Sequence, residues 1–103
     1  MPSALPSERD VLDHIKRHLL LGRLELSDLG LTLESIADDV PLLDESGLGL
    51  DSVEALDLLV GVEKSYGFHI QQIDKSFIES TCYSTRSLAH YVLARLAEQK
   101  ATA

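Results

Sequence analysis

The chain has 103 residues, of which 45% are hydrophobic and 25% charged, a composition typical of one globular domain. Its net charge of −8 arises from 17 acidic and 9 basic side chains. Such a chain repels nucleic-acid phosphates and anionic lipid surfaces, so we expect basic protein partners, no nucleic-acid binding and no membrane insertion. The single cysteine, Cys82, excludes an internal disulfide and favours a reducing, cytoplasmic location.

A first helix is predicted from about Glu8 to Gly22. Ser7 and Asp10 have the spacing of a capping box at its start. Its apolar residues recur at helical spacing and form the expected core face: Val11, Leu12, Ile15 and Leu19. Residues 1–10 contain no apolar run of the length typical of a secretory signal, and no apolar stretch of the sequence is long enough to span a bilayer.

Residues 23–50 keep no long helical period and contain three glycines and a proline. We interpret this stretch as a long loop with short helical turns. Its apolar residues should hold it against the core: Leu29, Leu31, Leu33, Ile36, Val40, Leu42 and Leu43. Structureless loops beyond roughly 12–15 residues are uncommon in compact domains and usually have a function.

Three further helical segments follow this loop. A helix should begin at Asp51 or Ser52 and reach about Ser65, with Gly67 ending it in a left-handed conformation. A short turn is expected over residues 74–79. Apolar residues in and beside that turn are expected to be buried: Ile73, Phe77 and Ile78.

The last helix should begin near Ser84 or Thr85 and end near Glu98, with a core face of Leu88, Ala89, Val92 and Leu96. No segment shows the period-2 alternation of a strand, and Phe68–Ile70 is too short for one. We therefore expect an all-α fold, a small antiparallel four-helix bundle with three longer helices, one short helix and a long first loop. The chain should form a single domain over 1–103, ordered over about residues 7–97, with frayed ends.

The helix that begins near Ser52 carries two apolar stripes. One is the expected core face: Ala55, Leu58, Leu59 and Val62. The second lies on nearly the opposite side and consists of Val53, Leu56 and Val60, bordered by Glu54, Asp57 and Glu63. A helix in a small bundle needs one buried face, so the second stripe either packs against the long loop or contacts another molecule.

Acidic residues are concentrated around the same helix. Residues 24–63 contain eleven acidic residues and no basic one. A solvated acidic surface that keeps the protein soluble is the ordinary explanation of such a run. An apolar stripe with an acidic border is also the composition of a docking site that attracts a basic partner and then excludes water.

Ser52 has two interpretations. A serine at a helix N-terminus commonly caps the helix by accepting a backbone N–H bond, and from position alone this explanation is favoured. A helix N-terminus also stabilises an attached phosphate, because the aligned peptide dipoles and free N–H groups favour negative charge there.

The segment from Gly49 to Leu58 resembles the Asp-Ser-Leu signature of acyl carrier proteins, read here as Asp51-Ser52-Val53. The similar register continues to Tyr66-Gly67-Phe68-His69-Ile70, and the resemblance covers roughly residues 8–96. It departs from the family at Val53, where leucine is usual, and at Lys64, where an acidic residue is frequent. The longer and more apolar approach over residues 47–50 resembles members from specialised fatty-acid or polyketide-type clusters.

The resemblance implies that Ser52 carries a 4′-phosphopantetheine arm donated from coenzyme A by a phosphopantetheinyl transferase. It implies a monomeric carrier and no enzyme, whose arm holds acyl groups as thioesters for fatty-acid or polyketide-type enzymes with basic patches. The implied partner-binding residues are Asp51, Val53, Glu54, Leu56, Asp57, Val60 and Glu63. In the family an acyl chain can lie between the helices, and the candidate lining, equally suited to a plain core, is Leu59, Val62, Phe77 and Ile78.

Two alternative functions stay open, an unmodified acidic interaction module and an aminoacyl or peptidyl carrier. Other chemistries have weaker signals. Asp44, Ser46 and Gly49 partly match a calcium-binding EF-hand loop, but Leu48 and Ala55 stand at two of its ligand positions. His14 and His18 have metal-ligand spacing without an evident third ligand, and Cys82 with His90 lacks a third orienting group, so we expect neither a metal site nor a thiol nucleophile.

Overall fold

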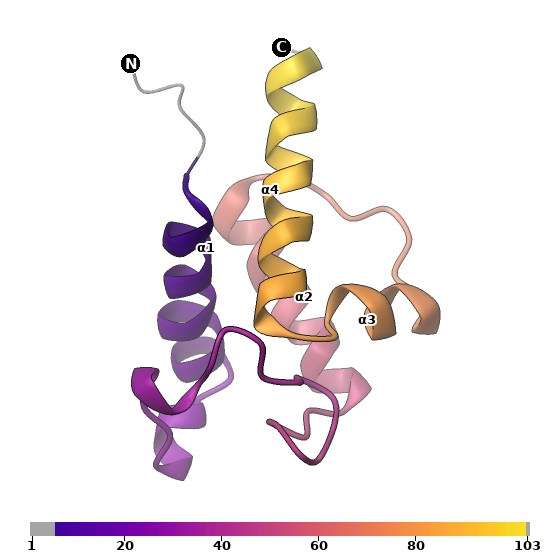
Figure 1. Ribbon diagram of the computed structural model, residues 1–103. Helices are drawn as coiled ribbons and strands as arrows, with labels where there is room; N and C mark the ends of the chain where they lie inside the picture. The colour runs from indigo at the N-terminus through magenta and orange to yellow at the C-terminus, as the bar shows by residue number, and fades with distance from the viewer. Residues whose placement is uncertain (1–5, 103) are drawn as a thin grey trace.

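Helices form the regular structure of the protein over residues 6–102, the part that the computed structural model describes (Figure 1). In chain order the elements are α1 (Glu8–His14), η1 (Ile15–Arg23), η2 (Leu26–Leu29), η3 (Leu33–Ser35), α2 (Ser52–Tyr66), α3 (Lys75–Thr81) and α4 (Thr85–Thr102). No strand occurs within these residues, and Phe68–Ile70 is irregular. The expected all-α class is therefore confirmed for the described part of the chain.

The first helical segment begins as predicted and ends slightly later. The Ser7 hydroxyl accepts the Asp10 backbone N–H at 3.1 Å, and the Asp10 carboxylate accepts the Ser7 N–H at 3.3 Å, which completes the capping box. The α-helix α1 continues into η1, which has the wider π-helical turn and extends one residue past the expected end at Gly22.

One apolar core connects the helices. In Figure 1, α1 and α4 lie side by side, α2 lies behind them and α3 crosses near the start of α4. The four residues of the predicted first-helix face are at most 4% exposed. The other helices and their flanking segments contribute Ala55, Leu58, Leu59, Val62, Phe68, Ile70, Cys82, Leu88, Ala89 and Val92.

The long loop contains the expected short helical turns, η2 and η3, but one of its predicted core contacts is wrong. Leu29 is 76% exposed, whereas Leu26, one turn earlier in η2, is 4% exposed. Leu26 thus fills the available core position, and Gly30, in the left-handed conformation, turns the chain directly after Leu29. Of the remaining predicted contacts, Ile36 and Leu42 are buried and the others are half-buried: Leu31, Leu33, Val40 and Leu43.

The last two helices differ from prediction in burial and in length. The residues expected to be buried around α3 are only half-buried, because α3 is a seven-residue helix at the edge of the core: Ile73, Phe77 and Ile78. Leu96 in α4 is half-buried as well. The helix α4 reaches Thr102, beyond the expected end near Glu98. The other predicted frayed residues, 1–5 and 103, lie outside the described residues.

Charged side chains hold the middle of the loop against α1 and α4. The Asp38 carboxylate accepts hydrogen bonds from Arg9, at 2.7 Å, and from Lys16, whose side chain is only 7% exposed. These two bonds hold the pKa of Asp38 well below its usual range. Arg86 of α4 pairs with Asp39 at 2.7 Å and with Glu8, and its backbone N–H donates to the Asp38 carbonyl oxygen at 2.8 Å. Two acidic residues of the loop, Asp38 and Asp39, therefore have partners inside the fold.

Candidate functional site

Asp51, and not Ser52, caps α2, so the capping interpretation of Ser52 is wrong. The Asp51 carboxylate accepts the Glu54 backbone N–H at 2.8 Å, and the Glu54 carboxylate accepts the Asp51 N–H at 3.1 Å. This reciprocal pair leaves Ser52 as the first helical residue. Its side chain is exposed, and its hydroxyl makes no hydrogen bond with any described residue. The oxygen is accessible to a reaction partner.

A tight turn positions Ser52 at the start of α2. The N–H groups of Gly47 and Gly49 both donate to the Asp44 carbonyl oxygen, at 2.9 and 3.0 Å. Gly49 has a φ of 63°, which favours glycine, and a Cβ atom added at Gly47 would lie 2.0 Å from the Pro41 carbonyl oxygen, so Gly47 has no room for a side chain. The glycines that the sequence places before Ser52 thus allow the chain to fold back closely on itself.

Backbone hydrogen bonds fasten this turn to the α3–α4 junction. The Leu42 N–H donates to the Tyr83 carbonyl oxygen at 3.0 Å, and the Leu50 N–H donates to the Leu42 carbonyl oxygen at 2.8 Å. The Asp44 carboxylate accepts the Ser46 N–H at 2.9 Å, and bonds from Ser46 lower the pKa of Asp44. The start of α2 is therefore held at a fixed place beside α3.

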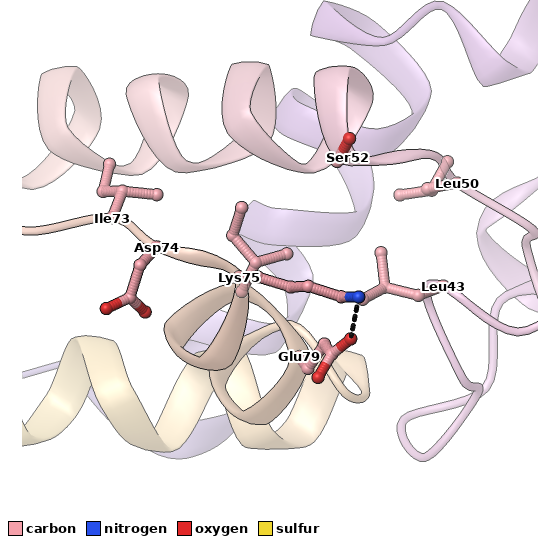
Figure 2. A pocket seen from close by; sticks show the side chains of 8 residues that line it. Leu43, Leu50, Ser52, Ile73, Asp74, Lys75 and Glu79 are labelled. Carbon is pink, nitrogen blue, oxygen red and sulfur yellow. Dashed lines mark ion pairs between the residues drawn. The ribbon is translucent and has the colours of Figure 1, made fainter.

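A cavity of about 400 Å³ opens beside Ser52, between the start of α2, the loop and α3 (Figure 2). Its apolar lining consists of Leu43, Leu50, Ile73 and Ile78. Polar side chains complete the lining: Ser52, Asp74, Lys75 and Glu79. In Figure 2 the Ser52 hydroxyl oxygen lies on the side of α2 away from Lys75. The site thus combines an exposed, unpaired hydroxyl with an adjacent apolar cavity.

Only one of the four predicted lining residues, Ile78, contacts this cavity. Leu59 and Val62 are fully buried core residues, and the Phe77 ring packs edge-on against Tyr91 with 5.2 Å between ring centroids. Leu50 and Ile73 were missed, although each directly precedes a helix cap, Asp51 or Asp74. An apolar residue before a cap often packs against its own helix, and that signal predicts that both side chains are partly buried without placing them in a common cavity.

The predicted partner-binding residues of α2 fall into two groups. Val53 is 72% and Leu56 44% exposed, whereas Val60 is half-buried. The acidic residues make contacts within the protein. Glu54 belongs to the cap of α2, and Asp57 pairs with Arg23 at 3.0 Å.

Glu63, at the far end of α2, also has partners within the chain. Its carboxylate accepts the Ile70 N–H at 2.6 Å and lies 3.1 Å from His69 Nδ1. The acidic border that the sequence suggested around the second stripe is therefore partly occupied by internal partners. The role of these seven residues in partner binding stays a prediction.

The surroundings of the two other candidate groups, the His14–His18 pair and Cys82 with His90, are those of structural residues. His14 and His18 have ring centroids 4.8 Å apart, and burial, together with His18, lowers the pKa of His14. Within residues 6–102, no group of three or more His, Cys, Asp or Glu side chains is arranged to hold a metal ion. Burial raises the pKa of the Cys82 thiol to about 12, which keeps it protonated, and His90 pairs with Glu8.

Comparison with protein-family models, with curated proteins and with solved structures finds no match for this chain. Among the described helices, none has the length and apolar character needed to cross a bilayer. The functional proposal therefore depends on the site itself and on the resemblance of the Ser52 segment.

Proposed function

We propose that this protein is an acyl carrier that holds acyl groups as thioesters on a 4′-phosphopantetheine arm attached to Ser52. The observation that carries the proposal is the exposed, unpaired hydroxyl of Ser52, a residue that lines an apolar cavity at the start of α2. A partner transferase supplies the arm from coenzyme A. The Ser52 oxygen forms the new bond to phosphorus and loses its proton, and the nucleotide part of coenzyme A leaves. In this proposal the fold is a small antiparallel four-helix bundle with a long first loop.

The surroundings of Ser52 fit this arm. Ser52 is the first residue of a 15-residue helix, and the N–H groups of a first helical turn stabilise a nearby phosphate. Asp51 already satisfies the Glu54 N–H, so the Ser52 hydroxyl is not needed for capping and can be esterified without loss of a helix cap. When bound, the arm supplies the thiol that forms the thioester, and the chain supplies attachment and recognition.

The cavity favours an aliphatic acyl group over an aminoacyl or peptidyl cargo. Four of its lining residues are branched aliphatic side chains, which offer no polar partner, and its two carboxylates, Asp74 and Glu79, are exposed to solvent. Transfer of a hydrocarbon chain from water into such a lining is favourable by roughly 25 cal/mol per Å² of apolar surface. The protein contributes no catalytic step, and it presents the cargo to fatty-acid or polyketide-type enzymes in the cytoplasm.

Val53 and Leu56 offer a second, separable role as a docking surface. Exposed apolar residues beside acidic side chains suit a partner with lysine and arginine around an apolar patch. This observation also favours the alternative of an unmodified interaction module. The two functions differ in whether Ser52 must be modified.

Intact-mass measurement tests the proposal. The purified chain is incubated with coenzyme A and a phosphopantetheinyl transferase, and the mass is expected to rise by one phosphopantetheinyl group. Ser52→Ala should abolish this gain, whereas the matched control Ser46→Ala, in the same loop, should retain it. An unmodified wild-type chain after incubation with several such transferases contradicts the carrier function and leaves the interaction module.

A further inference from the structure

Lys75 stands out among the residues that line the cavity beside Ser52. It is the first residue of α3, directly after the cap Asp74, whose carboxylate accepts the Phe77 N–H at 2.8 Å. In Figure 2 its stem runs along the cavity toward Leu43, below the start of α2. The ammonium lies 4.0 Å from a carboxylate oxygen of Glu79, one helical turn further on.

The ion pair between Lys75 and Glu79 is weak and can be exchanged. The two side chains are 88% and 61% exposed. Exposed pairs at this spacing contribute little to stability, because water and salt screen the attraction and both side chains lose freedom. A stronger anion close to Lys75 would therefore displace Glu79.

A phosphate on Ser52 would be such an anion once the Ser52 side chain turns toward the cavity, since the free hydroxyl lies on the side of α2 away from Lys75. Among the described residues that line the cavity, Lys75 is the basic one. Residues 24–63 carry no basic side chain, and Arg23 is already held by Asp57. The Asp51 carboxylate lies one residue before Ser52 and repels a phosphate there, so a compensating cation on the opposite wall gains importance.

We propose that Lys75 is a positioning residue for the arm, whose ammonium leaves Glu79 and pairs with the phosphate diester attached to Ser52. No covalent bond changes in this exchange, and Lys75 stays protonated. The pair fixes the phosphate end of the arm at the mouth of the cavity and draws the lysine stem toward Ser52. The inference rests on the proposed function, because it needs the modified serine.

Phosphorus NMR of the modified protein tests this role. The samples are wild type, Lys75→Gln, Lys75→Arg and Glu79→Gln, with Lys64→Gln as a matched control on the last turn of α2, outside the cavity lining. Intact mass first confirms complete modification of each sample. The phosphate resonance of wild type and Lys64→Gln is expected to move when NaCl is raised to about 1 M, where the Debye length falls to roughly 3 Å.

Lys75→Gln is expected to lose this salt-dependent shift of the phosphate resonance, whereas Lys75→Arg should keep it. Glu79→Gln should show a larger shift between low and high salt, because the carboxylate that competes for Lys75 is gone. A phosphate resonance in Lys75→Gln that matches wild type at every salt concentration overturns the Lys75 proposal and leaves the carrier function standing. Absence of any mass gain on Ser52 overturns the carrier function itself, and the Lys75 proposal with it.

Discussion

The two halves of the loop segment 31–50 are both acidic and are held in different ways. Residues 31–40 are fastened by charged side chains, with Asp38 and Asp39 bound to α1, η1 and α4. Residues 41–50 are fastened mainly by backbone hydrogen bonds and two glycine-dependent contacts, and they border the cavity. Both halves are acidic and contain leucine, and the two glycines and the proline of residues 41–50 mark the half that positions Ser52.

This difference shows that acidic residues in one sequence segment have different partners and different roles. An acidic side chain that meets a cation from a distant helix contributes to the fold, as Asp38 does with Lys16. An acidic side chain near Ser52 has local partners or solvent, as Asp44 has in Ser46. Substitutions in the two halves should therefore affect different properties, stability in the first and carrier function in the second.

Asp38→Ala should give the largest effect on stability. It leaves the ammonium of Lys16, which is 6% exposed as a residue, without its counter-ion, and breaking a buried pair in this way costs about 3 kcal/mol. Urea unfolding followed by circular dichroism measures the change. Glu34→Ala, at an exposed position in the same half of the loop, should stay within about 0.5 kcal/mol of wild type. Equal effects of the two substitutions would contradict the structural role of Asp38.

Acid should weaken the protein mainly through Asp38. The native pKa of Asp38 lies well below its ordinary value of 3.8, so the native state binds fewer protons than the unfolded chain. The contribution is complete above the ordinary pKa and is lost as the pH falls toward the native pKa. The urea midpoint should decline from about pH 5 to about pH 2.5.

Two variants separate the halves of the loop in this acid range. Asp38→Asn should flatten the decline. Asp44→Asn should change it less, because the bonds that lower the pKa of Asp44 come from Ser46, two residues away, and can persist in the unfolded chain. If Asp44→Asn flattens the pH dependence of the urea midpoint more than Asp38→Asn does, Asp44 and not Asp38 is the main source of the acid sensitivity.

Glu63→Ala should have an intermediate effect on stability. It removes the carboxylate that accepts the N–H of Ile70, a residue that is 4% exposed, and an unpaired buried amide costs about 1–2 kcal/mol. Glu63→Gln keeps an acceptor oxygen and should recover most of the stability in the same urea measurement. If Glu63→Ala weakens partner binding with no change in stability, Glu63 belongs to the docking surface after all.

Val53→Ser should have the smallest effect on stability and a visible effect on docking. Its side chain is 72% exposed, so the free energy of unfolding should change by less than about 0.5 kcal/mol. The rate of Ser52 modification at low transferase concentration should fall, because the partner loses an apolar contact. Leu29→Ser, at a similarly exposed position in η2, serves as the control and should be modified at the wild-type rate.

Much of the fold followed from the sequence, because local signals specify helices. The caps at Ser7 and the stop at Gly67 are formed as predicted. The prediction was wrong at two positions where either of two nearby residues could have filled the same role. Leu26 took the core position expected for Leu29, and Asp51 took the capping role considered for Ser52. Each of these two errors concerned which of two nearby residues fills one position.

The sequence by itself determined the helical class, the acidic character and the serine at the start of a helix, since these depend on residue type and short-range spacing. The tertiary structure alone decided which acidic residues are paired internally, because Arg9, Lys16 and Arg86 reach the loop from distant parts of the chain. It also decided that Leu50 and Ile73 face one cavity beside Ser52. Contacts between residues far apart in sequence arise only when the helices pack, and no local pattern encodes them.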